Sequence, residues 1–250
     1  TSYSTPNRLV FLFEGMPIKI YEKASKIKGP RTDAPKQALE GFIKSNNLNA
    51  KNVTQENTDK GRFYFASIKP KTIQVKEKLS KLIPEIIDKF SWKKSMKWSD
   101  YDLNWGRPLK SILALFDNKV LKFKFHHLTS NNSTFVDSAM EDSVKVVKDF
   151  KSYLKLLKDK NVILDHNLRK KYIIEKINKI SKSKSITSKI NEQLLNEVND
   201  LVEKPKVIAC KFNSNFLNIP EEILITSMQQ NQKYFPTFDQ KGDLTNIFLV

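Results

Sequence analysis

Few residues of this chain could carry acid–base or metal chemistry. Its three histidines are His126, His127 and His166, and Cys210 is its only cysteine. Adjacent residues of a strand point to opposite faces, so His126 and His127 are not expected to ligate one ion. Cys210 lies in the mostly apolar run 207–212, which predicts a strand and favours a buried small side chain over an activated thiolate. We therefore predict no catalytic residue, no bound cofactor and no metal in this chain.

Glycines and paired carboxylates supply no alternative active site. The 6 glycines are scattered, and none begins the Gly-Lys-Ser/Thr ending of a phosphate-binding loop. The pairs Glu141-Asp142 and Glu221-Glu222 lie where helices are predicted to start, and there carboxylates complement the helix dipole. Asp165-His166 has the reverse order of a histidine-aspartate metal motif and lacks partner histidines. Hydrolysis is therefore the least favoured activity.

Residues 216–236 carry polar and aromatic groups that a helix alone does not require. Pro220 suits the first turn of a helix, where its missing N–H costs nothing. The residues that follow combine amide, cationic and aromatic groups near the predicted end of the helix, namely Gln229, Gln232, Lys233 and Tyr234. This combination predicts a surface that contacts RNA or a protein partner.

The segment 216–236 also resembles the beta subunit of bacterial heterotetrameric glycyl-tRNA synthetase, whose pattern ends in Gln-Lys-Tyr-Phe-Pro. Six further blocks are similar to that family in the same order. They are Thr5-Pro6-Asn7-Arg8-Leu9, Lys28-Gly29-Pro30-Arg31, Lys94-Ser95-Met96-Lys97-Trp98, Arg107-Pro108 with Leu113-Ala114-Leu115, Leu194-Leu195-Asn196-Glu197-Val198, and Leu201-Val202-Glu203-Lys204-Pro205. One departure concerns Asn132-Ser133-Thr134-Phe135, which stands where the family has Gly-His-Arg-Phe.

The resemblance implies a fold and a set of partners. The fold would be α+β, with a mixed or antiparallel sheet and a helical block, similar to the editing-type domain of the phenylalanyl-tRNA synthetase beta chain. The partners would be tRNA(Gly) and the alpha subunit in an α2β2 cytoplasmic enzyme, without membrane or DNA. ATP would be used through the alpha subunit. Family members extend beyond both ends of this sequence, so we expect residues 1–250 to be a truncated N-terminal region.

A net charge of +17 and a pI near 9.7 predict a polyanionic partner. The alternative is compositional, because a chain rich in Lys, Asn and Ile is typical of AT-rich genomes. Trp92, Trp98, Tyr101 and Trp105 are interleaved with cations, so they could stack unpaired bases or fill a core. The cations taken as candidate RNA or partner contacts are Arg31, Lys94, Lys97, Arg107, Lys170, Lys171, Lys176 and Lys179.

Hydrophobic periodicity predicts the elements that position these residues. Strands are expected at 8–13 and 62–69, helices at 34–45 and 72–89, and a hairpin at 109–125 with Asp117-Asn118 as its turn. A helical block is expected over 142–203, with helices at 142–158, 167–180 and 190–202, a flexible loop at 181–185, and a soft domain boundary near 128–141.

These observations leave three hypotheses. The first is a non-catalytic part of glycine–tRNA ligase that binds tRNA and supports charging by the alpha subunit. The second is a protein–protein scaffold that docks the alpha subunit or later beta domains without touching RNA. The third is a hydrolase that edits mischarged tRNA. The salt dependence of RNA binding separates the first from the second.

Overall fold

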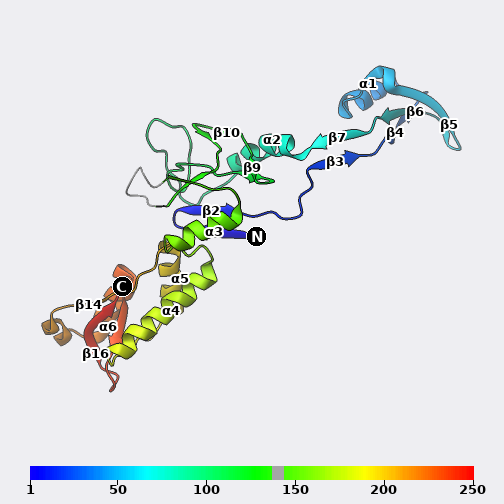
Figure 1. Cartoon of the computed structure of the whole chain (residues 1–250). Coiled ribbons are helices and arrows are strands. Elements are labelled where there is room, and N and C mark those ends of the chain that lie inside the picture. Colours follow the sequence, from blue (N-terminus) through cyan, green and yellow to red (C-terminus); the bar gives the residue numbers. More distant parts are fainter. Residues whose placement is uncertain (137–143) are drawn as a thin grey trace. The chain divides into compact units, whose positions relative to one another are not determined.

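The computed structural model describes residues 1–136 and 144–250, and the chain forms two units (Figure 1). Unit 1 consists of Thr1–Glu14 and Ser133–Val250, and unit 2 consists of Gly15–Asn132. The division after Asn132 falls within the expected boundary range 128–141, of which residues 137–141 lie outside the described residues. The division after Glu14 was not predicted, because the N-terminal residues contact residues after Asn132, such as Thr134 and Glu203, that are distant in sequence.

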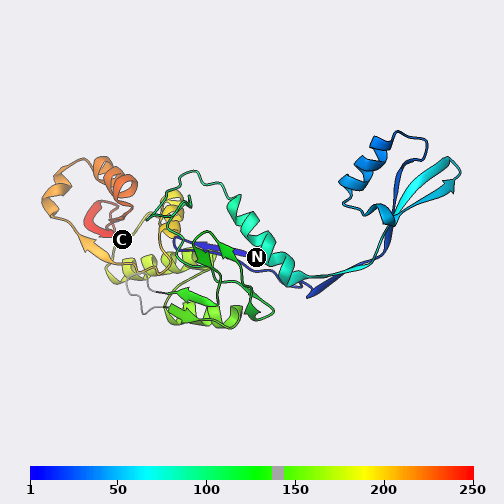
Figure 2. The same ribbon diagram turned by 90° about the horizontal axis from the view of Figure 1, so that it is seen from above.

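A three-stranded antiparallel sheet in unit 2 has the strand order β4-β6-β5. Its strands are β4 (Ser25–Arg31), β5 (Val53–Thr58) and β6 (Gly61–Ile68), and the short turn η1 (Ala50–Asn52) leads into β5. Helix α1 (Lys36–Ser45) lies on one side of this sheet (Figure 2). Ala66 on β6 is fully buried. The helix expected at 34–45 and the strand expected at 62–69 are both confirmed.

A two-stranded ribbon comes next in unit 2. Strand β3 (Lys19–Glu22) pairs antiparallel with β7 (Lys71–Gln74), and helix α2 (Val75–Asp88) follows directly. The prediction of a helix from residue 72 was wrong for its first turn, because residues 72–74 hydrogen-bond to β3. Pro84 lies inside α2 without ending it.

The rest of unit 2 is built from short hairpins around an aromatic core. Strand β8 (Leu115–Phe116) pairs with β9 (Lys119–Val120), and β10 (Lys124–Phe125) pairs with β11 (Leu128–Thr129). Asp117 and Asn118 have φ of 50° and 57°, which confirms the predicted two-residue turn, although the strands are shorter than expected. The buried residues are Leu103, Trp105, Leu121, Phe123 and Phe125, and Trp92 packs against them.

Unit 1 begins with a hairpin of β1 (Ser2–Thr5) and β2 (Arg8–Phe11). The second pair in this unit is β12 (Ser133–Phe135) with β13 (Val144–Val146). Helices α3 (Phe150–Asp159), α4 (His166–Ser183) and α5 (Glu192–Leu201) follow. The helix predicted from residue 142 was wrong in its first part, since residues 144–146 form β13; residues 142 and 143 lie outside the described residues.

The predicted loop 181–185 was also wrong at its start. Helix α4 continues to Ser183, and Ser181 is buried. Three apolar residues within the ranges of the predicted helices are mostly exposed, namely Val146, Leu168 and Leu201. Each lies at or near an element end, where periodicity alone does not show which residues a neighbouring element covers.

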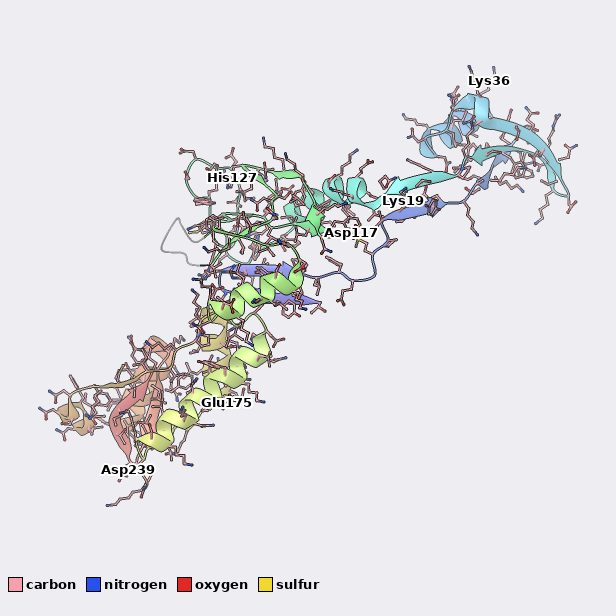
Figure 3. All side chains as sticks on the ribbon, in the orientation of Figure 1. Lys19, Lys36, Asp117, His127, Glu175 and Asp239 are labelled. Carbon is pink, nitrogen blue, oxygen red and sulfur yellow. The ribbon has the colours of Figure 1, made fainter. Side chains whose placement is uncertain are left out.

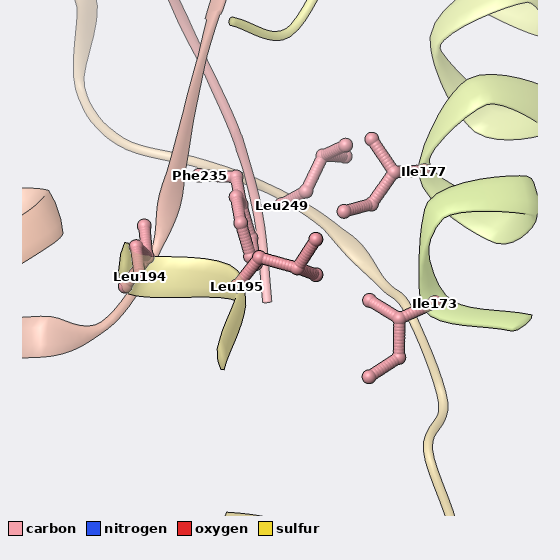
Figure 4. Packing of buried hydrophobic residues seen from close by; sticks show 6 residues of the cluster. All are labelled: Ile173, Ile177, Leu194, Leu195, Phe235 and Leu249. Atoms are coloured by element: carbon pink, nitrogen blue, oxygen red, sulfur yellow. The ribbon is translucent and has the colours of Figure 1, made fainter. Parts of the chain in front are cut away.

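The C-terminal part of unit 1 is a three-stranded sheet with the order β14-β16-β15. Its strands are β14 (Ala209–Lys211), β15 (Phe235–Phe238) and β16 (Leu244–Leu249), and Cys210 lies on a strand as predicted. Between β14 and β15 lie the short turn η3 (Ser214–Asn218), helix α6 (Glu221–Thr226) and the π-helical turn η4 (Ser227–Gln232). Figure 4 shows the core that joins this sheet to α4 and α5, formed by Ile173, Ile177, Leu194, Leu195, Phe235 and Leu249.

Helices combined with antiparallel strand pairs agree with the predicted α+β composition, although the strands form several small sheets. The similarity to the editing-type domain of phenylalanyl-tRNA synthetase stays a prediction. In the part of the chain that the structure describes, no helix is both long and apolar enough to cross a membrane.

Candidate nucleic-acid interface

Helix α3 presents a row of exposed lysines that sequence reasoning did not single out. Lys151, Lys155 and Lys158 line an open hollow of about 500 Å³ together with Asp149, Ser152 and Leu154. Among residues 1–136 and 144–250, these three lysines form no ion pair. Their spacing of four and three residues places them on one helix face, a signal readable from the sequence.

Asp149 is the carboxylate at this hollow, and it already caps helix α3. Its Oδ1 accepts a hydrogen bond from the backbone N–H of Ser152 at 2.6 Å, so it caps α3. That bond, followed by the one from the Ser152 side chain, holds the pKa of Asp149 below its ordinary value of 3.8. The hollow therefore combines three cationic side chains with one carboxylate that is committed to the helix end.

The four lysines predicted on α4 fall into two groups. Lys170 lies 2.6 Å from the Glu192 carboxylate, and the Lys176 ammonium lies 4.9 Å above the Tyr172 ring. Lys171 and Lys179 are exposed, and Glu175, which Figure 3 labels on α4, is midway between them in sequence. Because residues four apart are neighbours on a helix, Glu175 offsets part of their charge. Two of the four predicted lysines on α4 are therefore engaged by Glu192 and Tyr172, and the other two flank Glu175.

The predicted contacts at residues 229–234 are only partly available. The Lys233 ammonium pairs with Glu197 of α5 at 2.9 Å, and the Tyr234 ring stacks on Phe248 at 4.8 Å. Lys233 also adopts a left-handed conformation with φ of 62°, which ends the π-helical turn η4. Gln232 is exposed and Gln229 is half-buried. Lys233 and Tyr234 thus connect parts of unit 1 to one another.

A buried ion pair connects two segments that sequence analysis treated only as family blocks. Arg8 Nε lies 3.0 Å from Glu203 Oε2, and the two side chains are 10% and 9% exposed. Thr5 donates its hydroxyl to the same carboxylate at 2.8 Å. Arg8 also donates to the Thr134 hydroxyl and to the Phe135 carbonyl. This Arg8–Glu203 cluster therefore ties the N-terminal hairpin to β12 and to the chain after α5.

A second buried arginine supports the same region. Arg169 on α4 is 0% exposed and donates hydrogen bonds to the carbonyls of Asn199, Ile163, Leu164 and Ser4. Burial lowers the pKa of Arg169, and the carboxylates of Asp200 and Glu203 oppose that shift. Burial likewise raises the pKa of Tyr153, and the nearby Arg8 opposes that shift. The pKa shifts of Arg169 and Tyr153 therefore both follow from burial in the fold.

In unit 2 the predicted cations are dispersed. Lys97 pairs with Asp102 at 3.0 Å, and Arg31 lies 3.5 Å from Asp33. Lys94 and Arg107 are exposed. Trp105 is buried and Trp92 packs against it, which agrees with a core role for two of the three tryptophans. Trp98 contacts Tyr101 at 5.2 Å, and Tyr101 stacks on His127 at 3.6 Å.

Two of the three histidines contact a carboxylate, and each contacts a different one. His126 pairs with Asp88 at 3.3 Å, and His166 pairs with Asp200 at 3.1 Å. Asp165 caps α4 by accepting from the Leu168 N–H. Within the described residues, no three of His, Cys, Asp and Glu come together as metal ligands would.

Comparison with known proteins places the chain in one family. A family model described as glycyl-tRNA synthetase beta subunit matches residues 1–250. The chain is 36% identical to the glycine–tRNA ligase beta subunit of Rickettsia felis (strain ATCC VR-1525 / URRWXCal2), over 99% of this chain and 38% of that protein. It is also 36% identical to the beta subunit of Rickettsia akari (strain Hartford), over 98% of this chain and 37% of that protein. It therefore spans little more than a third of the length of these relatives. The chain belongs to the glycyl-tRNA synthetase beta-subunit family.

Proposed function

We propose that this chain serves glycine–tRNA ligation as a non-catalytic region that binds tRNA(Gly) and supports assembly with the alpha subunit. In this proposal the α2β2 enzyme attaches glycine to tRNA in the cytoplasm, and ATP is used through the alpha subunit. The observation that carries the tRNA-binding role is the exposed lysine face of α3, formed by Lys151, Lys155 and Lys158.

Unpaired exposed cations are the groups that phosphates neutralise. Each phosphate contact releases condensed counterions, so binding weakens linearly in log salt. A lysine that already pairs with a carboxylate or lies over an aromatic ring contributes less, which favours α3 over Lys170, Lys176 and Lys233. Lys171 and Lys179 on α4 would add secondary contacts. Phosphate contacts of this kind fix position without reading sequence.

The scaffold hypothesis is supported by a separate observation. The segment of η3 and α6 exposes apolar side chains, with Phe216 at 53% and Ile223 at 59% exposure, and Leu217 and Ile219 also exposed. Contiguous exposed apolar residues are typical of protein–protein contact sites. The alpha subunit or a later part of the beta subunit would cover them, and that contact would be insensitive to salt.

Editing hydrolysis is the least supported of the three. Within the described residues, the groups with shifted pKa values are Tyr153, Arg169, Asp149 and Asp239. Tyr153 and Arg169 belong to buried structural clusters. Asp149 caps a helix, and Asp239 accepts backbone N–H bonds from residues 241–243 in a turn. These surroundings account for the shifts without an acid–base role.

The experiment is a salt titration of tRNA(Gly) binding, against a non-cognate tRNA, by the synthetase that contains this chain. One variant reverses Lys151, Lys155 and Lys158 to Glu, and a second reverses Lys170, Lys171, Lys176 and Lys179. The matched control reverses Lys206, Lys211 and Lys241, which are exposed and lie elsewhere in unit 1. It changes the net charge by the same amount as the α3 variant.

We expect the α3 variant to reduce the slope of log K against log salt by about 2 to 3 units, as the loss of three phosphate contacts requires. The control should change it by less than about 1 unit. An equal loss of salt slope in the α3 variant and in the control would mean that the net charge is compositional and that α3 is not a binding site. Salt-insensitive binding together with lost alpha-subunit association after Phe216→Ser and Ile223→Ser would favour the scaffold.

A further inference from the structure

The β4-β6-β5 sheet of unit 2 has two faces of different character. Helix α1 covers one face, where the Phe42 ring lies against Gly29 of β4. Side chains alternate along strands, so Phe63 and Phe65 of β6 share the opposite face. Within the described residues, α1 and η1 are the elements outside the sheet that pack closely on these strands. We call this opposite face the outer sheet face.

Cations lie directly over the two rings of the outer sheet face. The Lys28 ammonium is 3.5 Å from the centre of the Phe63 ring, and the Lys26 ammonium is 5.1 Å from that of Phe65. Arg31 lies 5.8 Å from the Phe63 ring. Glu56 of β5 holds Lys26 through a 2.5 Å ion pair. Planar apolar rings and cationic side chains therefore lie together on one half-buried face.

We propose that the outer sheet face binds unpaired RNA nucleotides, a proposal that rests on the tRNA-binding function proposed above. Bases would stack on Phe63 and Phe65 in place of the ammonium groups that now cover them. The displaced ammonium of Lys28 would contact the phosphates, and Lys26 and Arg31, which already pair with Glu56 and Asp33, would contribute less. Aromatic rings that stack bases, beside cations that follow the backbone, are the means by which single strands are bound.

The spacing of the rings selects unpaired nucleotides over a duplex. Two residues along a strand are about 7 Å apart, so Phe63 and Phe65 are separated by roughly that distance. Bases in a duplex are stacked about 3.4 Å apart and present only their edges. Two rings about 7 Å apart can each receive a base only when the bases are splayed, as in loops and single-stranded ends.

The test uses the whole synthetase and three probes: a short unpaired RNA, the same RNA annealed to its complement, and tRNA(Gly). The variant Phe63→Leu/Phe65→Leu removes the aromatic faces and keeps apolar bulk. Tyr21→Leu is the matched control, since Tyr21 is an exposed aromatic residue on β3 outside this sheet. Far-UV circular dichroism and thermal unfolding establish that each variant is folded.

We expect the double variant to bind the unpaired RNA about tenfold or more weakly, with less than a twofold change for the duplex. Lys28→Gln should lower the salt slope for the unpaired RNA by about 0.7, whereas Lys44→Gln on α1 should leave it nearly unchanged. A photoreactive uridine in the RNA should crosslink to β6 in the wild type and lose that crosslink in the double variant.

Equal affinity of the wild type and the double variant for the unpaired RNA would overturn the assignment of this face, while salt-sensitive tRNA(Gly) binding would leave the proposed function standing. Salt-insensitive tRNA(Gly) binding by the wild type would overturn the proposed function instead. Loss of the alpha subunit from the double variant, with unchanged RNA affinity, would mean that the outer sheet face binds protein, and the RNA assignment would fail.

Discussion

Arg8 and Glu203 are 195 residues apart in sequence, yet they form the most buried ion pair among the described residues. Removing one partner of such a pair leaves the other charge buried without compensation, which is costly. An ion pair between exposed side chains is screened by water and contributes little. The loss of stability on breaking an ion pair therefore depends on how deeply the pair is buried.

We expect Glu203→Gln to reduce the free energy of unfolding by about 3 kcal/mol, since Arg8 would remain buried without a carboxylate. Asp102→Asn is the matched control, because Asp102 pairs with Lys97 while 94% exposed. It should cost less than about 1 kcal/mol. Denaturant unfolding of both variants measures the difference. Equal costs would contradict the role assigned to burial.

Helix α3 depends on its first turn. Asp149 and Ser152 form a capping box, in which the Asp149 carboxylate accepts from the Ser152 N–H and the Ser152 hydroxyl accepts from the Asp149 N–H. The box satisfies N–H groups that would otherwise lack partners at the helix start. Since α3 also carries the lysine face, the cap positions the candidate phosphate contacts.

Asp149→Ala should destabilise unit 1, and Asp149→Asn should do so less, because Asn keeps an acceptor oxygen at the cap. The pKa of Asp149 is lower in the folded chain than the ordinary value of 3.8, so its carboxylate stabilises the fold fully at pH values above about 4. That contribution is lost as the pH falls through the folded pKa. Thermal unfolding between pH 7 and pH 2.5 should show the wild type approaching Asp149→Asn in acid. A constant gap would contradict the prediction.

The contact between α1 and β4 depends on one glycine. A Cβ on Gly29 would lie 2.8 Å from the Phe42 ring, whereas a Cβ on Gly41, inside α1, would meet nothing within 4 Å. Close approach of the helix and the sheet therefore requires Gly at position 29 alone. Gly29 and Gly41 therefore allow the same substitution to be compared at a crowded and at an open position.

Gly29→Ala should cost about 1 to 3 kcal/mol of stability, because the ring and the helix must move apart. Gly41→Ala should add about 0.5 to 1 kcal/mol, since Ala favours the helix interior and nothing opposes it. Chemical denaturation of unit 2 in the two variants provides the measurement. Destabilisation by Gly41→Ala would contradict the open space beside Gly41 on α1.

At the scale of the whole molecule, unit 1 is assembled from both ends of the sequence. Thr1–Glu14 joins Ser133–Val250, and the Arg8–Glu203 cluster and Arg169 both make polar contacts between these segments. Segments joined in this way should become unstable together, although they are distant in sequence.

Arg8→Met should therefore accelerate amide hydrogen exchange in β2, in β12 and around Glu203 together, because the guanidinium of Arg8 on β2 donates hydrogen bonds to the other two segments. Hydrogen exchange followed by mass spectrometry measures this directly. Thr134→Val, which removes only one of the acceptors of Arg8, serves as the milder control. Acceleration confined to residues near Arg8 would contradict a shared cluster.

Local patterns predicted much of the secondary structure and little of the pairing. The helices at 34–45 and 167–180 and the Asp117-Asn118 turn follow from periodicity and turn chemistry, which act over a few residues. Strands β13 and β7 were missed, because helices were expected to start there. Their strand character comes from partners elsewhere in the chain. The α3 lysines were readable from spacing, yet their lack of carboxylate partners was not.

The sequence by itself determined the family, through blocks spread over the chain, as well as the net charge of +17 and the single cysteine. Only the tertiary structure decided which charges are available to a partner. It pairs Lys233 with Glu197, Lys170 with Glu192 and Arg8 with Glu203, and it leaves the lysines of α3 exposed. The physical reason is that an ion pair depends on distance in space, which residues far apart in sequence acquire only on folding.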